Sequence, residues 1–283
     1  VSALHQIPNG QVWELKDILE RKAIIEAAGL TWSVIESIPV HEDIKTRSGN
    51  YKQYIENYKT SIRNVGAAGL DLVCYNFMPI LDWTRTELAW SLPNGAKALR
   101  FEKKEVVAFD LFMLKREGAE REYTPQEIQR AKEFFENASE ETLKRLNDNI
   151  LKGLPGSEEG YTMEQFQAAL DSYQGIGHAE LERNLQLFLD AILPVAEKNG
   201  VKMAIHPDDP PFDVFGLPRV MSTAKDMKRL ISDNNSPNNG FTFCTGSYGV
   251  RADNDLPAMV EEFGEHIHFI HLRSTRRDVD GNF

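Results

Sequence analysis

The sequence predicts an α/β protein built on a parallel sheet or barrel, and three observations support this. Short apolar runs alternate with amphipathic helical stretches through most of the chain. A glycine follows several predicted helices, as at Gly29, Gly69 and Gly200, where the left-handed backbone of a helix end favours glycine. Three strands of the second half each end on a residue that can bind a metal. Strands that alternate with helices pair in parallel through right-handed crossovers.

The first third of the chain contains three predicted strands separated by two helices. The strands cover residues 1–5, 31–36 and 70–76, and the helices cover residues 14–28 and 51–68. Their ends carry the polar side chains His5, Glu36 and Asn76. Polar residues at strand ends are expected to line the mouth of a barrel. Each of them could instead cap a helix or satisfy the backbone of a loop.

Residues 93–177 interrupt this regularity. The segment contains no convincing buried strand and is rich in Glu, Lys and Arg. Helices are predicted over residues 102–116, 125–152 and 163–173. We expect a helical insertion after the third strand, forming a lid or an oligomer contact within a single domain that covers residues 1–283. A separate helical domain is the less favoured alternative, because the sheet pattern resumes afterwards.

The second half supplies the candidate metal ligands. A helix is predicted over residues 180–199, followed by strands over residues 201–206, 240–244 and 268–271. The strands end on His206, Cys244 and His271, and each spacing fits one βα unit of roughly 30 residues. Successive parallel strands would bring these residues to the rim where α/β enzymes place their chemistry. Imidazole and thiolate suit Zn, Fe or Mn better than Mg or Ca. The alternative is that each residue merely ends a strand.

The loops after these strands hold further candidates. Arg251, which follows Tyr248 in a polar loop, and Arg273, which follows His271, could each clamp a carboxylate, although most loop arginines are solvated. Trp83 either lines a pocket or contributes to packing.

The pair Asp208 and Asp209 follows the first ligand-bearing strand after one residue, Pro207. These carboxylates could bind the metal, orient a ligand histidine, or form an Asp-Pro turn. The sequence contains no nucleotide-binding glycine motif and no paired CxxC motif, so the predicted site is a set of dispersed residues.

Composition limits the partners. The chain has 283 residues and a formal net charge of −11, which argues against a broad surface for nucleic acid or an anionic membrane. A small anionic substrate remains compatible with a few local arginines. We see no apolar run of about 18 residues and no signal peptide. The two cysteines, Cys74 and Cys244, indicate a reducing compartment, so we expect a cytoplasmic protein without disulfides.

Several strings of this sequence closely resemble the mannonate dehydratase family, and the resemblance covers essentially the whole chain. They lie at residues 3–10, 41–45, 75–85, 205–211, 244–255 and 271–275. The resemblance implies an α/β fold of the xylose-isomerase-like TIM (β/α)8 barrel type. It also implies Mn²⁺ or Fe²⁺ as cofactor, and dehydration of D-mannonate to 2-dehydro-3-deoxy-D-gluconate in hexuronate degradation. The family's metal ligands are two histidines, a cysteine and an aspartate, of which the first three map onto His206, His271 and Cys244.

The sequence departs from the family pattern at both ends. It begins at the first predicted strand and ends at Phe283, before the region that in the family holds the last two strands, the fourth ligand and a catalytic histidine. We therefore expect a barrel that lacks its last strands in this chain, as part of a longer protein or as a truncated form. Principal acid and base residues are expected beyond Phe283.

Dehydration of a sugar acid removes the C2 proton and expels the C3 hydroxyl, and a divalent ion stabilises the charge that develops on the carboxylate. We predict Tyr248 and Arg251 as catalytic residues, with Arg251 or Arg273 holding the substrate carboxylate. The predicted substrate-binding residues are His5, Asn76, Trp83 and Arg273. The alternatives are a metal-dependent sugar isomerase or epimerase, and an incomplete barrel that binds metal or sugar acid without turnover. We expect a homo-oligomer that acts on D-mannonate.

Overall fold

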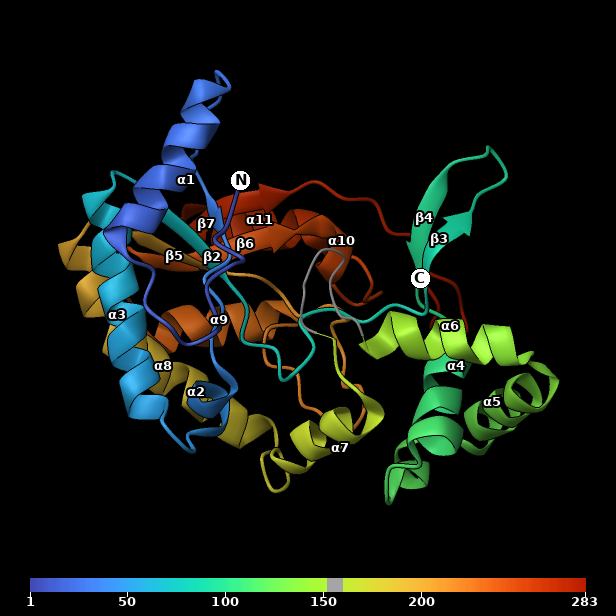
Figure 1. Cartoon of the computed structure of the whole chain (residues 1–283). Coiled ribbons are helices and arrows are strands. Elements are labelled where there is room, and N and C mark those ends of the chain that lie inside the picture. The colour runs from blue at the N-terminus through green and yellow to red at the C-terminus, as the bar shows by residue number, and fades with distance from the viewer. Residues whose placement is uncertain (152–159) are drawn as a thin grey trace. The chain divides into compact units, whose positions relative to one another are not determined.

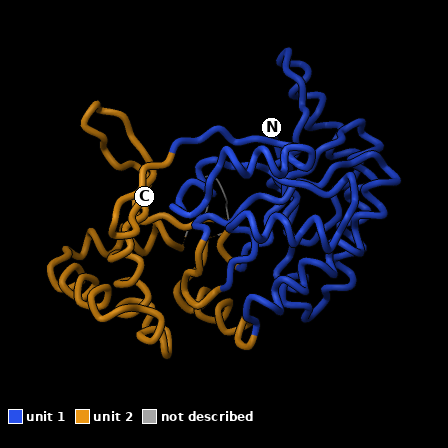
Figure 2. Tube along the Cα trace, turned by 180° about the vertical axis from the view of Figure 1, so that it is seen from behind, with its two compact units in different colours: residues 1–79, 176–211, 218–274 blue, residues 80–175, 212–217, 275–283 orange. Residues whose placement is uncertain are grey.

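The computed structural model describes residues 1–151 and 160–283 (Figure 1). The chain forms two compact units, shown in different colours in Figure 2. The first, called the barrel unit here, comprises Val1–Pro79, Ile176–Pro211 and Pro218–Ser274. The second, the helical unit, comprises Ile80–Gly175, Phe212–Leu217 and Thr275–Phe283. The insertion predicted over residues 93–177 lies almost wholly within the helical unit, which begins earlier, at Ile80.

The barrel unit is organised around one parallel sheet of five strands in the order β1-β2-β5-β6-β7. The strands are β1 (Ile35–Glu36), β2 (Leu72–Tyr75), β5 (Lys202–Ile205), β6 (Asn239–Cys244) and β7 (Ile267–His271). All four neighbouring pairs are parallel, and every residue of β6 is buried. The predicted α/β class is confirmed, and the sheet forms half a barrel. The first predicted strand, over residues 1–5, contributes only a bridge between Ser2 and Ile35.

The helices of the barrel unit occupy the crossovers and loops between these strands. They are α1 (Leu15–Ala27), α2 (Glu42–Thr46), α3 (Tyr51–Ala67), α8 (His178–Lys198), α9 (Ala224–Asp233), α10 (Thr245–Tyr248), α11 (Leu256–Phe263) and the 3₁₀ turn η3 (Gly264–His266). The predicted stop signals hold at α3 and α8, where Gly69 and Gly200 have φ values of 73° and 66°. No helix among the described residues is both long and apolar enough to cross a membrane.

Aromatic packing joins α8 to the sheet. The Phe188 side chain is fully buried, and its ring centroid lies 5.1 Å from that of Tyr58 on α3 and 6.1 Å from that of Tyr75 on β2. Phe77, which follows β2, is 5.8 Å away. This cluster fixes α3 and α8 against the strand that precedes β5 in the sheet, so it supports the strands that carry the candidate ligands.

The helical unit contains an antiparallel hairpin and a set of helices. Its elements are β3 (Glu87–Ser91), β4 (Lys97–Arg100), α4 (Lys103–Ala108), the π-helical η1 (Phe109–Leu114), the 3₁₀ turn η2 (Ala119–Glu122), α5 (Pro125–Asn137), α6 (Glu140–Leu151) and α7 (Met163–Asp171). The hairpin was not predicted from the sequence, because its residues are exposed or half-buried and show no buried apolar run. The helix predicted over residues 125–152 is two helices, broken at Ala138, whose ψ of 140° is extended. Residue 152 lies outside the described residues.

A half-buried histidine in β7 predicts acid sensitivity of the barrel unit. Burial, with the positive charge of Lys202 nearby, lowers the pKa of His268 from 6.5 to about 4, and its Nε2 has no hydrogen-bond partner among the described residues. The folded protein therefore binds this proton less readily than the unfolded chain. The stability contributed by neutral His268 is present above pH 6.5 and is lost as the pH falls through about 4.

We expect a His268→Gln variant to lose less stability than the unsubstituted protein when the pH is lowered from 7.5 to 5. The two proteins should differ by about 1 kcal/mol in the stability they lose. This is less than the full pKa difference would give, because the imidazole is partly exposed to solvent. Urea unfolding of both proteins at the two pH values measures it. Parallel pH profiles for the two proteins would contradict the prediction.

Candidate metal centre

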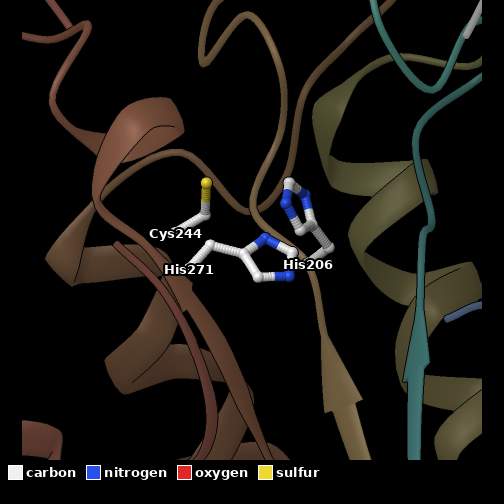
Figure 3. A group of neighbouring side chains, drawn as sticks. All are labelled: His206, Cys244 and His271. Carbon is white, nitrogen blue, oxygen red and sulfur yellow. The ribbon is translucent and has the colours of Figure 1, made fainter. Parts of the chain in front are cut away.

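Three side chains converge at the carboxyl ends of adjacent strands (Figure 3). His206 directly follows β5, Cys244 ends β6 and His271 ends β7. Cys244 and His271 are register partners in the parallel ladder, so their side chains leave the same face of the sheet. One candidate ligand atom from each of the three residues lies within 4.8 Å of the others. The structure thus brings together the residues that strand spacing predicted.

Each histidine has one ring nitrogen held by an oxygen atom. His206 Nδ1 lies 2.7 Å from the backbone oxygen of Pro207, and His271 Nε2 lies 3.2 Å from Glu36 Oε2. An N–H that donates to such an oxygen leaves the other ring nitrogen with the lone pair that binds a metal. Both rings are therefore oriented as in protein metal sites, the first by the main chain and the second by a carboxylate.

The site favours a thiolate at Cys244. Burial alone would raise the pKa of this thiol, but hydrogen bonds with His206 and His271 and the positive charge of Arg273 lower it to about 5. Hydrogen bonds to Cys244 and Glu36 raise the pKa of His271 to about 9. Burial opposes ionisation of Glu36, yet its bond to His271 lowers the pKa of this carboxyl. The positive charge of His271 thus lies between the negative charges of Cys244 and Glu36. A bound cation would replace the proton of His271 as the positive charge beside the thiolate.

These donors fit a divalent transition metal. Two imidazoles and one thiolate form a mixed nitrogen and sulfur set, which selects first-row transition ions over Mg²⁺ or Ca²⁺. Three protein ligands leave coordination positions for a further ligand, a water or substrate oxygens.

A network of polar groups surrounds the sulfur of Cys244. The Ser247 hydroxyl donates at 3.2 Å to Cys244 Sγ and lies 3.1 Å from Asp209 Oδ2. Arg273 Nη2 donates to the same carboxylate oxygen at 2.6 Å and to the Ser247 hydroxyl at 2.9 Å. Gly246 makes this arrangement possible, because a Cβ atom at this position would overlap the Arg273 side chain.

The two aspartates after His206 have separate roles. Asp208 is buried and accepts hydrogen bonds from the Met221 amide at 2.6 Å and the Ser222 hydroxyl at 2.7 Å, so it fixes the loop. Asp209 holds Arg273. Neither belongs to the group of candidate ligand atoms. Of the three interpretations of this pair, the structure favours a turn for Asp208, whereas the contacts of Asp209 with Arg273 and Ser247 match none of the three.

Other predicted site residues are not members of this cluster. Tyr248 has 0% exposure, packs its ring 5.3 Å from that of Phe243, and has no hydrogen-bond partner for its hydroxyl among the described residues. This core position does not favour the predicted catalytic role. Arg251 pairs with Asp253 at 2.6 Å and donates to the Pro211 carbonyl at 3.2 Å. Its contact with a substrate stays a prediction.

The predicted substrate-binding residues also stay predictions. In the barrel unit, His5 is exposed and Asn76 is half-buried. Trp83 belongs to the helical unit, where it is buried with the Arg85 guanidinium 5.0 Å from its ring centroid. Among them, Arg273 donates to the Ser247 hydroxyl, which in turn donates to Sγ of the candidate ligand Cys244.

Two residues of the site were not selected as such from sequence. Glu36 was noted only as a polar strand end, and Ser247 only as part of a polar loop. Glu36 ends β1, as Cys244 ends β6 and His271 ends β7. This shared strand-end position could have identified Glu36 as a site residue from the sequence. The fold and this cluster together define an α/β half-barrel protein with a candidate site for a divalent metal at its strand ends.

Comparison with known proteins gives the family. The family model described as D-mannonate dehydratase (UxuA) matches residues 1–283. The mannonate dehydratases of Marinomonas sp. (strain MWYL1) and Saccharophagus degradans are 56% and 51% identical over the full length of this chain, which spans 73% and 71% of them. The crystal structure of mannonate dehydratase from Streptococcus suis serotype 2 superposes with a TM-score of 0.73 at 41% identity. That match covers 97% of this chain and 64% of the other. This chain belongs to the D-mannonate dehydratase family, which is named for a hydro-lyase.

Proposed function

We propose that this chain acts as a metal-dependent D-mannonate dehydratase, with Mn²⁺ or Fe²⁺ held by His206, Cys244 and His271. The reaction removes the C2 proton and the C3 hydroxyl and yields 2-dehydro-3-deoxy-D-gluconate and water. The observation that carries the proposal is the convergence of the three ligand atoms within 4.8 Å in a chain of this family.

The chemistry explains why these donors are useful. Removal of a proton next to a carboxylate places negative charge on that carboxylate, and a divalent ion supplies compensating positive charge there. Cys244, with its pKa near 5, is already a thiolate at neutral pH and would hold the ion without losing a proton, whereas His271, with its pKa near 9, would release one. Ser247 donates a hydrogen bond to this sulfur and so keeps it in place.

Arg273 supplies positive charge beside the site, although Asp209 compensates part of it. We propose that Arg273 or Arg251 holds the carboxylate of the sugar acid.

The setting of the enzyme is also a proposal. Both cysteines are buried and free, which suits a reducing compartment, and we propose that the protein works in the cytoplasm as a homo-oligomer on a small sugar acid.

The test is formation of the 3-deoxy-2-keto acid from D-mannonate. We expect product with added Mn²⁺ or Fe²⁺, loss of product with a chelator, and recovery when the ion is restored. D-Gluconate, the C2 epimer, serves as the matched control substrate and should react far more slowly. A product that retains every hydroxyl group would instead indicate an isomerase or epimerase. Stoichiometric metal binding without turnover would indicate a binding protein.

A further inference from the structure

We infer that Glu36 is a positioning residue of the metal centre, which fixes the orientation and the protonated nitrogen of the ligand His271. The inference deepens the proposed function, because it assumes that His271 binds the ion.

Glu36 reaches His271 from the opposite end of the sheet. It ends β1, the first strand in the sheet order, whereas His271 ends β7, the last. Their side chains nevertheless meet, with 3.2 Å between Glu36 Oε2 and His271 Nε2. Both side chains are half-buried, at 28% and 25% exposure, which restricts the access of water to this contact.

The Glu36 carboxylate is itself held in place. Cys74, its register neighbour on β2, donates at 3.8 Å to the other carboxylate oxygen, Oε1. Burial raises the pKa of the Cys74 thiol well above its usual range, so it remains protonated and able to donate. Thr242 on β6 donates to Cys74 Sγ at 3.2 Å. A chain of contacts therefore runs from Thr242 on β6 through Cys74 and Glu36 to His271.

Glu36 is not one of the candidate ligands. Its carboxylate accepts a hydrogen bond from Nε2 of His271. The group of mutually close ligand atoms comprises His206, Cys244 and His271, without Glu36. A proton fixed on Nε2 by a carboxylate leaves the lone pair on Nδ1, and it makes the ring a stronger ligand.

The two histidines differ in a way that makes the inference testable. His206 is oriented by the Pro207 carbonyl, which no side-chain substitution removes. His271 is oriented by a replaceable side chain. Loss of such a partner commonly lowers metal affinity by about 10–100-fold while the ligand set is preserved.

The experiment is a Co²⁺ titration followed by visible absorption, which reports thiolate ligation and coordination geometry. Three variants separate the possible causes: Glu36→Ala, Glu36→Gln and Glu36→Asp. We expect Glu36→Ala to bind about 10–100-fold more weakly with the same spectrum and one ion per chain. Glu36→Gln should recover most of the affinity, because its amide oxygen can accept the same N–H. Glu36→Asp keeps the charge but is one methylene too short, so it should bind more weakly than Glu36→Gln.

The control is Asp43→Asn, which alters a carboxylate 3.7 Å from another histidine of the barrel unit, His41, and should leave the titration unchanged. Thermal unfolding of the metal-free variants confirms that each is folded.

Unchanged affinity in Glu36→Ala overturns the inference. A greater loss of affinity in Glu36→Gln than in Glu36→Asp also overturns it, because the negative charge alone would then explain the effect. A change in the spectrum of every Glu36 variant would make Glu36 a direct ligand and also overturns it. If the unsubstituted protein binds no Co²⁺, the metal centre of the proposed function fails first.

Discussion

A Cys244→Ser variant is expected to lose its bound ion and to convert D-mannonate at least about 10³-fold more slowly. Loss of the ion removes several kcal/mol of charge stabilisation from the transition state, and about 4 kcal/mol corresponds to that factor. Cys244 is the anionic member of the ligand cluster, with a pKa of about 5, whereas a serine hydroxyl stays protonated at neutral pH. Metal content after dialysis and the rate of 3-deoxy-2-keto acid formation measure the two effects.

Cys74→Ser is the matched control for this substitution. Cys74 is also a buried thiol of the same sheet, but burial raises its pKa well above the usual range and it does not belong to the ligand cluster. A serine there can still donate to Glu36, so the variant should keep one bound ion, with an affinity reduced far less than in Cys244→Ser. Unchanged metal content and rate in Cys244→Ser would remove the basis for the metal centre.

A Phe188→Ala variant is expected to destabilise the barrel unit by about 3–5 kcal/mol. The Phe188 ring is fully buried between α8 and the sheet, in contact with Tyr58, Tyr75 and Phe77. Its removal leaves a cavity that these rings cannot close without leaving their own contacts. Urea-induced unfolding measures the change in the free energy of unfolding.

Leu19→Ala provides the comparison for this loss of stability. Leu19 lies on α1 with 45% exposure, so its truncation should change stability by no more than about 0.5 kcal/mol. A loss below about 1 kcal/mol in Phe188→Ala would show that the aromatic cluster repacks and does not hold α8 to the sheet.

Sequence patterns were sufficient for the parallel sheet and for the three candidate ligands. Strand ends in successive βα units meet at one rim by topology alone, so His206, Cys244 and His271 could be grouped without knowing the curvature of the sheet. The ends of α3 and α8 were predictable because the left-handed residues there are glycines.

Contacts that depend on curvature or on exposure could not be predicted in this way. The bond between Glu36 and His271 joins residues 235 positions apart, on strands that are not neighbours, and no spacing rule relates them. The hairpin of β3 and β4 buries too little apolar surface to produce a recognisable pattern. Tyr248 was predicted to be catalytic because it lies in a polar loop; its ring packs on Phe243, and its catalytic role stays a prediction.

The close approach of Arg273 to Gly246 couples the evolution of two positions 27 residues apart. A side chain at position 246 requires Arg273 to leave its contacts with Asp209 and Ser247, and a smaller residue at position 273 removes the reason for a glycine at 246. Single substitutions at either position therefore pass through a disfavoured intermediate, whereas a paired change can avoid it. We expect the two positions to covary among related sequences, and libraries that diversify this loop to yield more functional variants when both positions change together.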